Sequence, residues 1–121
     1  MEFRSQQAIY QQVADHVCGM ILKGTWKPGE RMPSVRELAM EMEVNPNTVN
    51  KGFAYLQDRG LIHNERGIGY FINDQAPAQT RNIKRAEFFE ETLPQVFHSM
   101  TLLDISIDEI EEKWKNHRRP Q

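Results

Sequence analysis

The segment NPNTVNK, residues 45–51, places three amides, a hydroxyl and an ammonium group at the start of a predicted helix. Asn45 is a favourable N-cap and Pro46 suits the first helical position, so we expect a helix from Pro46 to about Arg59, ended by Gly60. Asparagine can bond bidentately to adenine, threonine reaches base edges or phosphates, and a helix N-terminus attracts phosphate. The pattern predicts contact with DNA; the alternative is that these are ordinary cap and surface residues.

The apolar positions of this helix indicate which of its side chains point outward. Its inner stripe comprises Val49, Gly52, Phe53 and Leu56. By helical periodicity, Asn47 and Lys51 lie on the opposite face, and Thr48 and Asn50 lie on the flanks. The polar groups at the start of the helix are therefore left for a partner outside the chain.

A shorter helix precedes this one. Ser34 and Glu37 form a capping box for a helix over about 35–42. The residues that we expect it to bury are Leu38, Ala39 and Met42. A tight turn at 43–45 joins the two helices into a helix-turn-helix, although Glu43 stands where the turn usually has glycine and a left-handed residue costs ~1–2 kcal/mol. Further upstream, a helix over 7–23 has an apolar stripe of Ile9, Val13, Val17, Met20 and Ile21.

Two β-prone segments within 61–72 flank a glycine-containing turn, which predicts a hairpin. Its tip, RGIG at 66–69, places one guanidinium beside two residues without side chains, where backbone can approach a surface closely. A helix-turn-helix followed directly by a hairpin is a winged helix. We therefore expect a mainly α fold with a small β-wing, its winged helix-turn-helix domain covering residues 1–73.

The rest of the chain divides into a linker at 74–80 and a helical tail at 81–121. A heptad-like seam runs through Ala86, Phe89, Leu93, Val96, Met100 and Leu103, and Phe88 and Phe97 widen it. Pro94 predicts a kink near 90–94 or a break into two pieces, and a further helix begins at a Ser106–Glu109 capping box and carries Trp114. About 40 residues seldom hold a core alone, so we expect the tail to pack against the winged domain, a second chain or both, and to serve as the dimerisation region. Packing within one chain only is the alternative.

Residues 9–72 resemble the GntR family of bacterial transcriptional regulators. The segments that carry the resemblance are "PGERMPSVRELA" and "GLIHNERGIGYFI". "NPNTV" and "LPQVFHSM" resemble the YtrA-like subfamily, whose members carry only a small helical dimerisation tail. The resemblance implies a homodimeric repressor that binds an inverted-repeat operator, with the recognition helix in the major groove and the wing in the minor groove.

The resemblance also implies which residues meet DNA: one arginine of the first motif helix, the start of the recognition helix, and the wing tip. With the polar residues derived above, the expected contacts are Ser34, Arg36, Asn45, Pro46, Asn47, Thr48, Asn50, Lys51, Arg66, Gly67 and Ile68. The expected dimer interface consists of Ala86, Phe89, Leu93, Val96, Phe97, Met100, Leu103 and Trp114. Many family members have arginines where Pro46 and Asn50 stand, so the target sequence should differ.

Composition bounds the remaining possibilities. The 121 residues carry a formal net charge of −2, and no apolar run is long enough for a membrane span. Cys18 is alone, which fits a reduced, cytoplasmic setting. No nucleophile–base pair, phosphate loop or metal-ligand spacing appears, so we expect no enzyme, cofactor or metal. The near-neutral charge favours a second hypothesis, a winged-helix protein-interaction module without a DNA role; Arg36, Lys51 and Arg66 on one expected face favour DNA. A small-molecule effector remains open.

Overall fold

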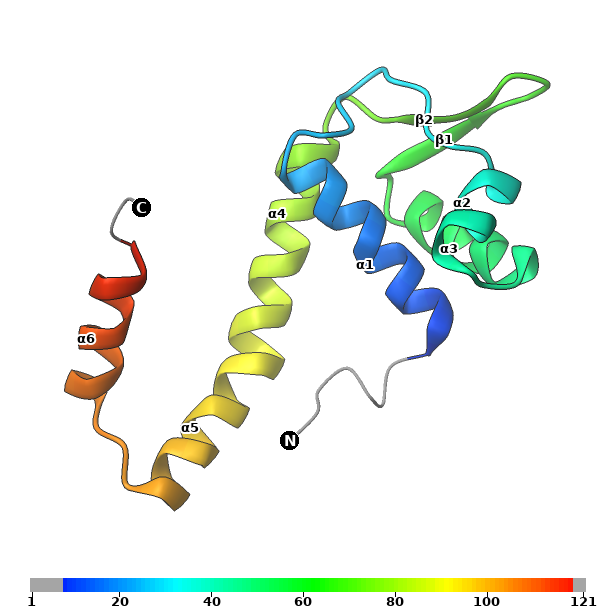
Figure 1. Cartoon of the computed structure of the whole chain (residues 1–121). Coiled ribbons are helices and arrows are strands. Elements are labelled where there is room, and N and C mark those ends of the chain that lie inside the picture. Colours follow the sequence, from blue (N-terminus) through cyan, green and yellow to red (C-terminus); the bar gives the residue numbers. More distant parts are fainter. Residues whose placement is uncertain (1–7, 119–121) are drawn as a thin grey trace. The chain divides into compact units, whose positions relative to one another are not determined.

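The computed structural model describes residues 8–118 and divides the chain into two compact units, Met1–Lys84 and Arg85–Gln121 (Figure 1). The elements of the first unit are α1 (Ile9–Leu22), α2 (Val35–Met42), α3 (Pro46–Asp58), β1 (Ile62–Glu65), β2 (Gly69–Ile72) and most of α4 (Ala76–Glu87). The second unit continues with a π-helical turn (Phe88–Thr92), α5 (Leu93–Leu103) and α6 (Ile107–Arg118). The mainly α fold with a small β-wing that the sequence predicts is confirmed.

The core of the first unit lies where α1, α2, α3 and the hairpin meet. Its largest fully buried side chains are Phe53, Leu38, Leu56, Leu61, Ile62, Ile72, Val13, Val17 and Val49. The predicted inner stripe of α3 is buried throughout. The predicted stripe of α1 is wrong at its start, because Ile9 remains half exposed and it is the neighbouring Tyr10 that contacts α3.

Helices α1 and α3 pack closely at Gly52. A Cβ atom at this position would lie 3.0 Å from Cγ1 of Val13 and 3.1 Å from the carbonyl oxygen of Tyr10. These distances are shorter than van der Waals contact, so only glycine allows α3 to approach α1 this closely. This crossing fixes which face of α3 is buried and leaves the start of the helix exposed.

The hairpin pairs β1 with β2 in antiparallel register, from Ile62 opposite Ile72 to Glu65 opposite Gly69. The loop ahead of α2 adds a short third segment to the hairpin, because Arg31 forms an isolated antiparallel β-bridge with Phe71 of β2. Three backbone hydrogen bonds hold this segment against β2. The Met32 amide donates to the Tyr70 carbonyl (2.8 Å), the Ile72 amide to the Glu30 carbonyl (3.1 Å) and the Gly29 amide to the Ile72 carbonyl (2.8 Å). The sequence analysis does not predict this third segment.

The structure contradicts the predicted linker at 74–80, because α4 begins at Ala76. Ala76 and Thr80 are fully buried, and the side-chain amide of Gln79 donates to the Arg59 carbonyl at 2.8 Å. Lys84 forms an ion pair with Asp15 of α1. Small residues and a proline suit a helical first turn as well as a linker, and burial against the core decides between the two.

In the second unit the structure resolves how the tail accommodates Pro94. A proline ring clashes with the carbonyl four residues earlier in an α-helix. Here the chain forms a π-helical turn over Phe88–Thr92, closed by a hydrogen bond from the Leu93 amide to the Phe88 carbonyl. In place of the expected kink or break, the structure has a π-helical turn directly ahead of Leu93 and Pro94.

Helix α5 ends at Asp104, whose φ of 56° is left-handed. The predicted capping box then starts α6: the Glu109 amide donates to the Ser106 hydroxyl (3.2 Å) and the Ser106 amide donates to the Glu109 carboxylate (3.0 Å).

Candidate nucleic-acid interface

The start of α3 is built by local signals. Asn45 caps the helix, its Oδ1 accepting from the Asn47 amide at 2.8 Å, and Pro46 occupies the first turn. The Asn45 side chain is therefore committed to the cap. The side chains of Asn47 and Asn50 are exposed and make no hydrogen bond to any residue that the structure describes. These two amides are the groups that α3 leaves free to read a base.

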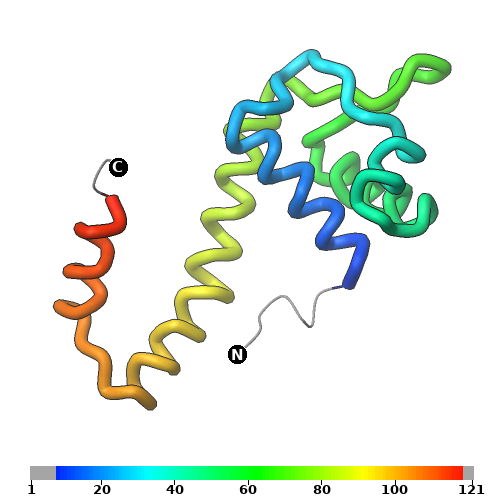
Figure 2. The backbone as a smooth tube through the Cα atoms, viewed as in Figure 1, coloured from blue at the N-terminus to red at the C-terminus, as the bar shows by residue number. Residues whose placement is uncertain are grey.

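The turn between α2 and α3 keeps the two helices close (Figure 2). Glu43 has φ 58° and ψ 47°, the left-handed conformation expected for this position. The Val44 amide donates to the Ala39 carbonyl at 3.0 Å, which closes the turn. The strain at Glu43, ~1–2 kcal/mol, is offset by this hydrogen bond and by the packing of both helices.

Helix α2 presents its N-terminus beside this turn. The Ser34 hydroxyl accepts from the Glu37 amide (3.1 Å), and the Glu37 carboxylate accepts from the Ser34 amide (2.8 Å). The hydrogen bonds from the Ser34 amide and hydroxyl, with Arg31 nearby, lower the pKa of Glu37. The Ser34 hydroxyl is thus occupied by the cap, whereas Arg36 is exposed and forms no ion pair within the described residues.

Lys51 is exposed, as predicted, but it is held by a neighbour that sequence reasoning missed. Its Nζ lies 5.3 Å from the centroid of the Tyr10 ring of α1. Tyr10 in turn meets the Tyr55 ring edge-on at 6.1 Å, and the Arg59 guanidinium covers Tyr55 at 3.5 Å. Such contacts contribute ~0.5–1 kcal/mol each at exposed sites and restrict where the ammonium of Lys51 can reach.

The wing tip is exposed at Arg66, Gly67 and Ile68. Gly67 has φ 79°, a conformation that favours glycine, and the Ile68 amide donates to the Glu65 carbonyl at 2.9 Å to close the turn. The structure places the tip in the same unit as the starts of α2 and α3, and Figure 1 shows the wing and the α2–α3 pair on the same side of α1.

His63 of β1 is exposed and contacts one residue of its own strand and the residue that follows β2. Its ring contacts the Asn73 side-chain oxygen through Nδ1 and the Glu65 carboxylate through Nε2 at 3.0 Å. Both partners are acceptors, so the protonated imidazolium satisfies both at once. The hydrogen bond with Asn73, and then that with Glu65, raises the pKa of His63 above 6.5.

We expect the wing to lose stability as pH rises through this raised pKa. A group whose pKa is higher in the folded state contributes its full stabilisation below the unfolded value of 6.5 and loses it above the folded value. The His63 ring-proton signal in an NMR titration should have its midpoint above 6.5, and Glu65→Gln should lower that midpoint. A midpoint at or below 6.5 would contradict the double hydrogen bond.

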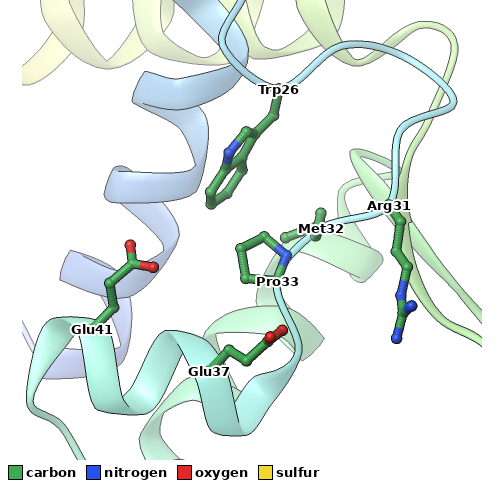
Figure 3. Close-up of a pocket in the computed structure, with 6 residues that line it drawn as sticks. All are labelled: Trp26, Arg31, Met32, Pro33, Glu37 and Glu41. Carbon is green, nitrogen blue, oxygen red and sulfur yellow. The ribbon is translucent and has the colours of Figure 1, made fainter.

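A groove of about 470 Å³ opens beside α2 (Figure 3). Its lining residues are Trp26, Arg31, Met32, Pro33, Glu37 and Glu41. Within the described range 8–118, no group of three or more His, Cys, Asp or Glu residues is placed to hold a metal ion. Over the same residues, no helix is long and apolar enough to cross a membrane.

The second unit exposes an unusual amount of apolar surface. Over the described residues 85–118 no side chain is fully buried. The large apolar side chains that are exposed here are Phe88, Phe89, Phe97, Leu102, Leu103, Ile107, Ile110 and Trp114. Of the expected interface residues, Leu93, Val96 and Met100 are partly buried and the others are exposed.

Comparison with known proteins agrees with this arrangement. Residues 9–72 match the model described as "Bacterial regulatory proteins, gntR family". The chain is 44% identical over 73 residues to the HTH-type transcriptional repressor YtrA of Bacillus subtilis, a match that covers 60% of this chain and 56% of that protein's length. A GntR-family regulator from Bacteroides thetaiotaomicron superposes with a TM-score of 0.72 at 38% identity, over 91% of this chain and 96% of that one. The AraR DNA-binding domain, solved in complex with operator ORR3, superposes with a TM-score of 0.52 at 28% identity. This match covers 53% of this chain and 77% of the AraR chain.

Proposed function

Since the chain belongs to the gntR family of bacterial regulatory proteins, we propose that it is a sequence-specific, DNA-binding transcriptional repressor that works in the cytoplasm as a homodimer. The observation that carries the proposal is the exposed start of α3, where the side chains of Asn47 and Asn50 find no hydrogen-bond partner among the described residues. The similarity to the Bacillus subtilis repressor supports the repressing role.

In this proposal each part of the interface has its own task. The start of α3 enters the major groove, where the amides of Asn47 and Asn50 can bond bidentately to adenine. Arg36 and Lys51 bind phosphates and set the register of the helix on the duplex. Arg66 at the wing tip enters the minor groove, whose potential attracts a guanidinium. The side chains of Ser34 and Asn45 act indirectly, by capping the helices that carry these groups.

The second unit supplies the dimer. A surface of exposed phenylalanines, leucines, isoleucines and a tryptophan on short helices is typical of a region that packs against a partner. A second copy of this chain fits it, because like apolar faces are self-complementary in a two-fold dimer. The two winged domains of a dimer, which we call its reading heads, then require an operator with an inverted repeat. Binding both half-sites at once raises the affinity by ~10²–10⁴-fold.

Replacing the two amides one at a time tests the base-reading role. Asn47→Ala or Asn50→Ala should cost ~1–3 kcal/mol of binding free energy on the preferred site and relax the preference at one base pair. Asn82→Ala removes the same group from an exposed position on α4 and should change nothing. Affinities for a set of single-base variants of the site, measured by fluorescence anisotropy, separate these outcomes.

Two other results would revise the proposal. An equal loss on every duplex would make the residue a phosphate contact that reads no base. Failure of the wild-type protein to bind any duplex at low salt would contradict DNA binding and favour a protein partner for this face.

A further inference from the structure

Arg31 lies in the loop between α1 and α2, outside every segment from which DNA contacts were expected. Its backbone forms a β-bridge with Phe71, which makes the residue part of the third segment of the wing. It also lies three residues ahead of Ser34, the cap of α2. Arg31 therefore stands at the junction between the first motif helix and the wing.

The side chain of Arg31 occupies space that is open only because residue 69 is a glycine. A Cβ atom on Gly69 would lie 3.0 Å from Nε of Arg31 and 3.6 Å from its Cζ and Nη2. The guanidinium therefore packs against bare backbone at the start of β2, beside the wing tip. Gly69 has φ 141°, which also favours glycine, and Figure 3 shows the Arg31 side chain running away from Trp26 and Pro33.

The charge of Arg31 is available to a partner outside the chain. The residue is exposed, and it forms no ion pair with any residue in the described part of the chain. The nearby Glu37 carboxylate accepts the Ser34 amide in the capping box at 2.8 Å. That carboxylate is thus oriented by the helix cap, and the guanidinium keeps its donors free.

We propose that Arg31 binds a phosphate of the DNA strand that separates the major groove read by α3 from the minor groove entered by the wing. The planar fork of a guanidinium suits bidentate phosphate binding. Arg31 precedes Arg36 of α2 by five residues and contacts Gly69, three residues after Arg66 of the wing tip, so in this proposal its charge links the cations of α2 and the wing. The inference rests on the proposed DNA-binding function and adds a residue that positions the head.

The salt dependence of DNA binding tests this role. Arg31→Ala should lower affinity about tenfold at low salt, equally for all sequences. It should also reduce the slope of log K against log salt by about 0.9 for each head. Arg31→Lys should keep the slope and recover part of the affinity. Arg81→Ala, which removes the same charge from exposed α4, should leave both quantities unchanged.

A double-mutant cycle tests the role of Gly69. Gly69→Ala should weaken DNA binding about as much as Arg31→Ala, because the new methyl group displaces the guanidinium. In the Arg31→Ala background the same substitution should have little further effect, although its backbone strain is present in both. Equal losses in the two backgrounds would overturn the role given to Gly69.

Two outcomes separate this inference from the proposed function. An unchanged slope in Arg31→Ala, while Arg66→Ala lowers it, would remove Arg31 from the interface and leave DNA binding standing. A wild-type protein that binds no duplex would overturn both.

Discussion

Phe97→Asp should convert the protein from a dimer into a folded monomer and lower its affinity for a full operator by ~10²–10⁴-fold. Half of the Phe97 surface is exposed on α5, so the monomer loses little packing when the ring is removed. In the proposed dimer, however, the new carboxylate would be buried without a partner, which favours separation of the subunits. Sedimentation at micromolar concentration reports the oligomeric state, and titration of labelled operator reports the affinity.

His98→Asp is the matched control, since it introduces the same carboxylate at the next, exposed position of α5 outside the apolar set. It should remain dimeric. If Phe97→Asp also remains dimeric, the interface lies elsewhere. If Phe97→Asp is monomeric and still binds the full operator as tightly as the wild type, bivalent binding is wrong.

Phe53→Ala should lower the free energy of unfolding of the first unit by ~3–5 kcal/mol. Phe53 is fully buried on α3, and its ring meets Tyr70 of the wing at a centroid distance of 4.7 Å and an angle of 68°. The ring therefore joins the recognition helix to the wing, and its loss leaves a cavity between the two. Urea denaturation followed by tryptophan fluorescence measures the change.

Met40→Ala provides the comparison, because it removes a large apolar side chain that is 75% exposed on α2. Its effect should stay within ~0.5 kcal/mol. A loss of less than ~1 kcal/mol for Phe53→Ala would mean that the ring does not hold the two parts of the interface together.

The parts of the interface that the sequence predicts well are those that local chemistry determines. The Ser34–Glu37 capping box begins α2 at Val35, and Asn45 with Pro46 begins α3, as expected from residues at most three positions apart. The left-handed turn at Glu43 follows from the spacing of the two helices. These signals do not depend on the rest of the fold, so one sequence is enough to recognise them.

The features that the sequence does not predict depend on contacts between distant residues. Tyr10 reaches Lys51 only because Gly52 lets α1 and α3 approach. Arg31 joins the wing through a bridge to Phe71, forty positions away. Ala76 begins a helix because the core buries it. In each case the residue type permits several environments, and tertiary packing selects one.

Selection of bound duplexes from a random pool, with the wild-type protein, tests the central claim most directly. The proposed homodimer with two reading heads predicts enrichment of an inverted repeat, its half-sites separated by a whole number of helical turns, so that both heads meet one face of the duplex. No enrichment over the starting pool, at a salt concentration where the protein still binds DNA, would contradict sequence-specific reading by α3.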